Sequence, residues 1–167
     1  TYAAVSKGSK GLAHANTLNT WAVTTATVGL SVICFGNHLF VAAGEGTVYT
    51  RNTSDETGWV QSTAPFSGTP TAIAFGEVDG TPKYVVGTET GNLYASSDGK
   101  TWTLSTSGHG SLSSITFFNG KFYAARLDDN SILSSSDGTQ WNILSYISEF
   151  ENGTRSICGD PIGHLYA

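Results

Sequence analysis

The tryptophans of this chain recur at a nearly constant interval. They stand at positions 21, 59, 102 and 141 of 167 residues, so successive ones lie 38, 43 and 39 residues apart. Two further ladders run in phase with them. One is a Ser/Thr-to-Ile segment, found at 31–35, 71–75, 113–117 and 155–159, and the other is an aromatic and aliphatic segment, found at 38–43, 83–87, 121–125 and 164–167. Three ladders that share one period of about 40 residues indicate an array of structural repeats.

Each repeat has the pattern of four short strands joined by polar turns. Apolar runs such as Val32–Phe35 and Tyr84–Val86 have strand length, Gly and Asn turns separate the predicted strands, and helical periodicity is absent. The first two strands of each repeat are almost continuously apolar, as expected for strands that neighbouring sheets cover on both faces. A four-stranded unit of this length is typical of a β-propeller blade. We therefore predict an all-β protein in which residues 1–167 form a single β-propeller domain of four blades.

The repeats do not begin and end with the chain. Their approximate limits are 1–30, 31–70, 71–111 and 112–153, and residues 154–167 are predicted to complete the N-terminal blade. Such an overlap would close a four-bladed ring and hide its sheet edges. The alternatives are a chain cut from a longer array, and half of a larger ring in which two copies make eight blades.

A turn rich in Ser, Asp and Gly precedes the tryptophan. It reads Ser96-Ser97-Asp98-Gly99-Lys100-Thr101-Trp102 in one repeat and Ser135-Ser136-Asp137-Gly138-Thr139-Gln140-Trp141 in the next. The Asp is expected to accept hydrogen bonds from the backbone of its own turn, and the Gly to adopt the left-handed conformation beside it. The Trp ring is expected to cover the hairpin and close a small core at the outer edge of the blade.

This turn resembles the Asp-box (BNR) repeat of the sialidase-like β-propellers, with a looser version at 53–59 and a degenerate one at 16–21. The resemblance implies a structural role, remote from ligand sites, for Asp55, Trp59, Ser96, Asp98, Gly99, Trp102, Ser135, Asp137, Gly138 and Trp141. The style of the repeats also resembles that of bacterial and bacteriophage surface or tail proteins. It implies an extracellular or virion-surface location.

Catalysis of the sialidase type is not expected. Those enzymes use an arginine triad, whereas this chain has only Arg51, Arg126 and Arg155, which fall at different points of the repeat. Only Arg155, just before a first strand, stands where it would face the central channel. We predict no catalytic residue and no enzyme activity.

We also predict no cofactor and no metal site. His38 and His164 share a repeat position with Lys83 and Lys121, which suits an exposed turn better than a metal ligand. The segment 128–130 lacks the later bidentate acid of a calcium loop.

Composition excludes two classes of partner. Eight Lys and Arg against 13 Asp and Glu give a net charge of −5, which argues against nucleic-acid binding. No apolar run approaches the roughly 20 residues of a membrane-spanning helix, so no membrane insertion is expected.

Cys34 and Cys158 occupy equivalent repeat positions and are expected to be two buried thiols or, alternatively, a bridge between the first and last repeats.

These exclusions leave the surface loops as the functional elements. We predict a binding module that recognises a cell-surface glycan or a protein receptor. The alternatives are a purely structural propeller of a virion or surface complex, and a fragment of a sialidase-like glycoside hydrolase. A homo-oligomer, or the remainder of a larger propeller, is a further possible partner. Because only the strands and the Trp turns repeat, the variable hairpin tips are the candidate ligand-binding residues: Glu45, Glu89, Asn92, Asp128, Asp129 and Asn130.

Overall fold

The computed structural model describes residues 2–6, 10–17, 20–54, 58–147, 153–160 and 163–167. Within these ranges there are seventeen β-strands and no helix, so no described segment is a helix long and apolar enough to cross a membrane. The strands form five antiparallel sheets, in each of which strands adjacent in sequence pair with one another. The predicted all-β class is confirmed.

The five sheets follow the repeats of the sequence. The first sheet contains β1 (Tyr2–Val5), β2 (Gly11–Thr17) and β3 (Thr20–Thr25). The second contains β4 (Leu30–Gly36), β5 (Leu39–Gly44), β6 (Thr47–Asn52) and β7 (Val60–Thr63). The third contains β8 (Pro70–Val78), β9 (Thr81–Thr88), β10 (Leu93–Ser96) and β11 (Thr103–Thr106). The fourth contains β12 (Leu112–Phe118), β13 (Lys121–Arg126), β14 (Ser131–Ser135) and β15 (Asn142–Tyr146). The fifth contains only β16 (Cys158–Gly159) and β17 (Leu165–Tyr166).

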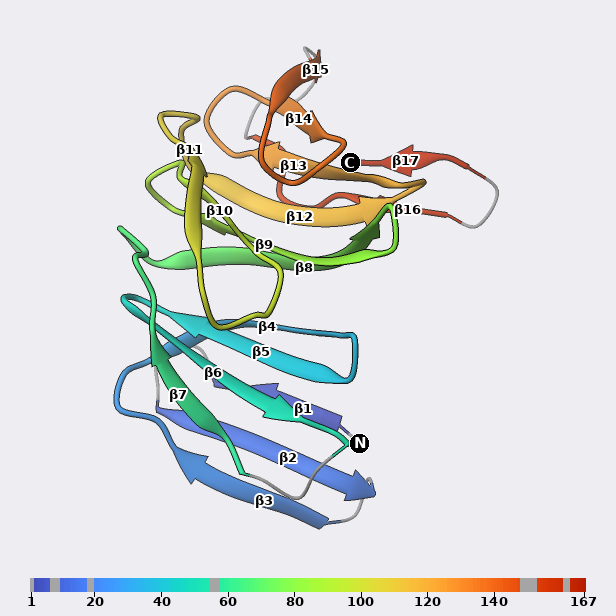
Figure 1. The fold of residues 1–167 in the computed structure, drawn as a ribbon. Coiled ribbons are helices and arrows are strands. Elements are labelled where there is room, and N and C mark those ends of the chain that lie inside the picture. Colours follow the sequence, from blue (N-terminus) through green and yellow to red (C-terminus); the bar gives the residue numbers. More distant parts are fainter. Residues whose placement is uncertain (1, 7–9, 18–19, 55–57, 148–152, 161–162) are drawn as a thin grey trace.

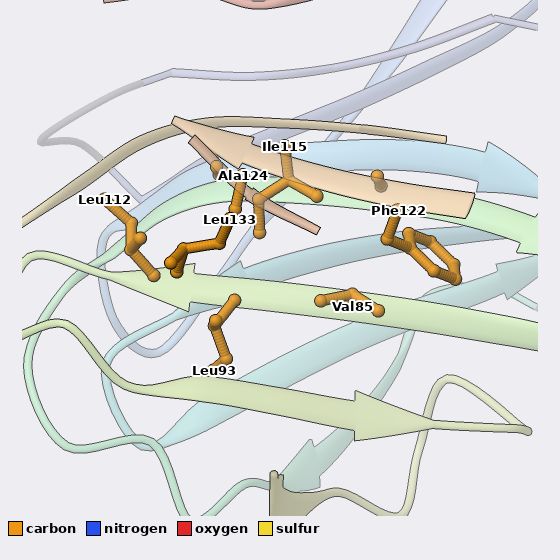
Figure 2. Close-up of a cluster of buried hydrophobic side chains, with 9 residues drawn as sticks. Val85, Leu93, Leu112, Ile115, Phe122, Ala124 and Leu133 are labelled. Atoms are coloured by element: carbon orange, nitrogen blue, oxygen red, sulfur yellow. The ribbon is translucent and has the colours of Figure 1, made fainter. Parts of the chain in front are cut away.

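Successive sheets are stacked face to face, with β4, β8, β12 and β16 as neighbouring inner strands (Figure 1). The hydrophobic core is divided accordingly into clusters that lie between adjacent sheets. Figure 2 shows the cluster between the third and fourth sheets, where Val85 and Leu93 meet Leu112, Ile115 and Phe122. This stacking of four-stranded units is the packing of a β-propeller.

The inner strands fit together through a ring on one strand and a glycine on the next. A β-carbon on Gly36 would come within 2.0 Å of the Phe75 ring, and one on Gly76 within 2.2 Å of the Phe117 ring. Between the fourth and fifth sheets the two roles are exchanged, because Phe118 lies against Gly159. Each interface therefore has one aromatic ring and one residue without a side chain.

A hydroxyl group lies at the start of each of the three longer inner strands. Ser31, Thr71 and Ser113 stand at irregularities in the pairing register, where each sheet has a β-bulge. The Ser31 hydroxyl donates to the Pro70 carbonyl of the next sheet at 2.6 Å, and the Ser113 hydroxyl donates in the same way to the Thr154 carbonyl. The two serines thus tie neighbouring sheets together.

The turns before Trp102 and Trp141 have the predicted geometry. Asp98 Oδ1 accepts hydrogen bonds from the Lys100 and Thr101 amides at 2.8 and 2.7 Å, and the indole of Trp102 donates to the Gly99 carbonyl at 3.2 Å. The second turn repeats these bonds at Asp137 and Trp141. The glycine in each turn has a positive φ, 70° at Gly99 and 74° at Gly138.

The other serines, aspartates and tryptophans of the predicted turns are placed less uniformly. Ser96 and Ser135 each donate to the Asp of their own turn and accept from the Gly amide. Asp55 lies outside the described residues. Trp59 is partly buried, with its ring centre 6.3 Å from that of Phe40. Trp21, which follows the degenerate version of the turn, is 43% exposed.

The C-terminal residues do not complete the N-terminal blade as predicted. β16 pairs with β17 and packs on β12, and neither strand pairs with the described strands of the first sheet. The first and fifth sheets stand at opposite ends of the stack (Figure 1). The ring therefore does not close within the described chain, because β16 continues the same face-to-face stacking instead of turning back to β1.

Both cysteines are free. Cys34 is partly buried and packs against the cluster that contains Val41 and Tyr84. Cys158 is exposed, which corrects the expectation of a buried thiol there.

Candidate ligand-binding site

A cavity of about 310 Å³ opens at the end of the sheets where the inner strands begin. We call it the inner-strand cavity. Its wall combines residues at the starts of β4, β8 and β12, residues of the turns that follow β9 and β13, and Arg155, which lies three positions before β16. The lining residues are Ser31, Thr69, Pro70, Thr71, Glu89, Ser111, Leu112, Ser113, Leu127 and Arg155.

Five of the ten lining residues bear a hydroxyl group, three are apolar, and the other two supply one carboxylate and one guanidinium. Glu89 Oε1 accepts hydrogen bonds from the Thr69 amide at 3.1 Å and from the Thr69 hydroxyl at 3.0 Å. Arg155 is exposed and makes no hydrogen bond or ion pair with the residues that the structure describes. The carboxylate is therefore held in place, whereas the guanidinium retains its capacity to bind an external acceptor.

An acidic turn supports one side of the cavity. Asp128 Oδ2 accepts a hydrogen bond from the Ser111 amide at 2.7 Å and so fixes the loop that leads into β12. Asp129 Oδ2 lies 2.8 Å from Arg126 Nη1 in an ion pair, and its other oxygen accepts from the Ser131 amide and hydroxyl. These two aspartates are thus occupied in shaping the turn.

His109 lies in the loop before this wall. Its Nε2 is 3.0 Å from the Thr106 hydroxyl. Burial, and secondarily the positive charge of Arg126, lower the pKa of His109. The side chain is therefore neutral at pH 7 and adds no charge beside the cavity.

The six hairpin-tip residues predicted as ligand-binding lie in turns at this same end of the sheets, but only Glu89 lines the cavity. Asp128 acts on the wall through the Ser111 amide. Asn92 folds back onto its own turn, with Nδ2 3.3 Å from the Thr90 hydroxyl. Glu45, Asp129 and Asn130 lie outside the cavity wall. The tips therefore share an end of the molecule without converging on one point.

The three arginines do not converge either. Arg155 lines the cavity, Arg126 pairs with Asp129, and Arg51 lies on β6, where its charge contributes to lowering the pKa of His14 after the larger effect of burial. Among the described residues no group of three or more His, Cys, Asp or Glu is arranged to hold a metal ion.

Of the residues that line the cavity, the sequence-based prediction of binding residues included Glu89 and left out the other nine. Arg155 stands at the repeat position that Ser31, Thr71 and Ser113 occupy elsewhere. That exchange of a hydroxyl for a cation in one ladder was the available signal. From the sequence, this position marks only the beginning of each inner-strand segment. The sequence does not indicate that these four residues surround one cavity.

The stacked sheets, with a polar cavity at the beginning of their inner strands, define the fold as a β-propeller. No family model matches the sequence. No curated protein matches it either. Solved structures do match the fold, and one of them is YCF48 bound to D1 peptide, with a TM-score of 0.66 and 17% sequence identity. The match covers 95% of this chain and 54% of that one, so the chain spans about half the length of YCF48.

Proposed function

We propose that this chain is a non-enzymatic binding module that holds an extended segment of a protein partner across the inner-strand cavity. The observation that carries the proposal is Arg155, an exposed cation without a partner among the described residues, in a wall that also has five hydroxyl-bearing residues. The cavity volume of about 310 Å³ suits one or two side chains of a bound segment. A rigid scaffold with an open polar end is a common basis of partner recognition.

A protein partner is favoured over a glycan for two reasons. YCF48, which shares the fold, is bound to a peptide in its solved structure. The described cavity wall also contains no aromatic side chain on which a sugar ring would stack. A cell-surface glycan that bonds to the hydroxyl groups remains the second candidate ligand.

The described part of the cavity wall does not have the carboxyl pair of a glycoside hydrolase. Its described wall offers a single carboxylate, Glu89, whose Oε1 is already bonded to Thr69. Hydrolysis of a glycosidic bond ordinarily uses a pair of carboxyl groups. This absence of a second carboxylate supports the proposal that the chain binds without catalysing a reaction.

The proposal extends to the kind of repeat and its location. The matching hydrogen bonds around Asp98 and Asp137 support a relation to Asp-box repeats, and the style of those repeats supports an extracellular or virion-surface protein. A purely structural propeller is the competing function, and it predicts an inner-strand cavity without ligand.

The test is binding of the purified chain to a peptide array and a glycan array. We expect saturable binding to a subset of peptides, at least about tenfold weaker in Arg155→Ala because a charge-assisted hydrogen bond is lost. Glu45→Gln is the matched control, since Glu45 is exposed at the same end of the sheets but lies outside the cavity. Peptide binding that Arg155→Ala leaves unchanged would overturn this site. Binding to glycans alone would favour the glycan as the ligand. If the folded chain bound to neither array, the purely structural function would be favoured.

A further inference from the structure

The hydroxyl groups that line the inner-strand cavity already donate their protons within the protein. Ser31 and Ser113 donate to carbonyl groups of the next repeat. Thr71 donates to a carbonyl of β9 at 3.2 Å, and Thr69 donates to the Glu89 carboxylate at 3.0 Å. Four of the five hydroxyl-bearing residues in the wall are therefore committed as donors. Their oxygens keep lone pairs, so what they offer a ligand is the capacity to accept.

The Glu89 carboxylate adds a further acceptor to the same wall. Its Oε1 is held by the Thr69 amide at 3.1 Å and by the Thr69 hydroxyl. Its Oε2 accepts no hydrogen bond from the residues that the structure describes. Arg155, the cation of the wall, forms no ion pair with Glu89. One carboxylate oxygen thus fixes the side chain, and the other is left for a ligand.

A second carboxylate lies in the equivalent turn of the next sheet. Glu89 follows β9 and Asp128 follows β13. The loop between these turns joins them, because the His109 amide donates to the Gly91 carbonyl at 3.2 Å and the Ser111 amide donates to Asp128 at 2.7 Å. Neither carboxylate forms an ion pair with a described residue. This side of the cavity is therefore negatively charged as well as rich in acceptors.

We propose that the protein segment held in the inner-strand cavity inserts a Lys or Arg side chain, whose cation binds Glu89 Oε2 and hydroxyl oxygens of the wall. This inference rests on the proposed function, because it specifies the chemistry of the segment bound there. A basic side chain brings only donors, three N–H groups on lysine and five on arginine, and it neutralises the Glu89 charge. A carboxylate or main-chain carbonyl would face only acceptors at this point. Arg155, in the next repeat, is left to bind an acceptor elsewhere in the segment.

The probe is a peptide library in which one central position is fixed as Lys, Arg, norleucine or Glu and the other positions are random. Both ends of the peptides are blocked, so that no terminal charge contributes. We expect the purified chain to retain the Lys and Arg peptides at least about tenfold better than the norleucine peptides, because a charge-assisted hydrogen bond is then made. Norleucine has an unbranched apolar side chain like that of lysine without the ammonium group, so the comparison isolates the cation.

Two matched variants locate the preference for a basic residue. Glu89→Gln keeps a side-chain oxygen for the Thr69 bonds but removes the charge, so it should abolish the preference. Glu45→Gln makes the same change of charge outside the cavity and should keep the preference. Equal losses in both variants would assign the preference to the net charge of −5 and overturn the inference.

The remaining outcomes separate this inference from the proposed function. Retention of peptides without preference for Lys or Arg, or a preference that Glu89→Gln keeps, would overturn the inference and leave the proposed function standing. If the folded chain retained no peptide at all, both would be overturned.

A second measurement needs no variant. The Thr69 amide proton is hydrogen-bonded to Glu89 Oε1, so its NMR chemical shift reports on the carboxylate. This shift should move when acetyl-lysine amide is added and stay constant with acetyl-norleucine amide. The same response to both compounds would overturn the inference, because it would show that the ammonium group is not recognised.

Discussion

The ring of Phe75 lies against the α-carbon of Gly36 across the boundary between the second and third sheets. Their contact is repeated by Phe117 on Gly76 and reversed by Phe118 on Gly159. The reversal shows that the interface requires one ring and one glycine but not a fixed direction. Successive sheets of the stack are therefore matched by pairs of residues that the repeat pattern alone does not connect.

The first prediction tests this pairing by exchanging its two members. Gly76→Phe alone is expected to lower the free energy of unfolding by about 3 kcal/mol, because two rings would compete for the space of one. Adding Phe117→Gly to it copies the arrangement of Phe118 and Gly159 and should restore part of the loss. Urea unfolding of the two single variants and the double variant measures the coupling.

Gly58→Ala is the control for this experiment. A β-carbon there meets nothing within 4 Å, so its effect should stay within about 0.5 kcal/mol. If the effects of the two single substitutions simply add in the double variant, Gly76 and Phe117 do not act as a pair.

The second prediction concerns acid unfolding. Burial by itself raises the pKa of Asp137, but hydrogen bonds from Thr139, Gln140 and Ser135 outweigh it and lower the pKa to about 2. An aspartate in the unfolded chain has a pKa of about 4. The stability contributed by Asp137 is therefore complete above pH 4 and is lost as the pH falls from about 4 through 2. Asp98 acts in the same direction, since its turn hydrogen bonds also lower its pKa against the effect of burial.

Melting temperatures measured from pH 7 to pH 2 check this prediction. Asp137→Asn should melt lower at pH 7 and lose less stability between pH 4 and pH 2 than the parent chain. Asp79→Asn, at an exposed turn, should keep the acid dependence of the parent. An acid dependence that Asp137→Asn leaves intact would show that other carboxylates govern it.

The third prediction separates the two thiols. Burial raises the pKa of the Cys34 thiol to about 12, whereas Cys158 is exposed. Because the thiolate is the reactive form, a thiol reagent at pH 8 should modify one cysteine of the native chain quickly and the other only on unfolding. Peptide mapping should assign the fast modification to Cys158. Recovery of a linked Cys34–Cys158 peptide from non-reduced protein would contradict the structure.

The sequence predicted what depends on local chemistry. The turns at Asp98 and Asp137 follow from residues within seven positions of one another, and the hydrogen bonds of the structure reproduce them. The strands follow from apolar runs between Gly and Asn turns. The period of about 40 residues then gave the size of each sheet and the stacking of the sheets.

What escaped prediction depends on contacts between repeats. The course of β16 was missed because its packing on β12 is set by Phe118 and Gly159, two residues that depart from the pattern. The inner-strand cavity was missed because it is formed by the same position in successive sheets. Arg155 shows the difficulty: its repeat position is visible in the sequence, but its lack of a partner among the described residues appears only when the neighbouring sheets are present.

The last prediction compares two tryptophans that the period treats as equivalent. Trp102 is only 6% exposed, its ring lies 5.2 Å from Phe66 in an edge-on contact, and its indole donates to the Gly99 carbonyl. Trp21 is 43% exposed on β3. Trp102→Ala should therefore cost about 3–5 kcal/mol of stability, as for a buried aromatic side chain. Trp21→Ala should cost about 1 kcal/mol or less, since the side chain buries much less area. Denaturant unfolding of both variants measures the two losses in the free energy of unfolding. Equal losses would mean that Trp21 is covered in solution by a surface that the described strands do not provide.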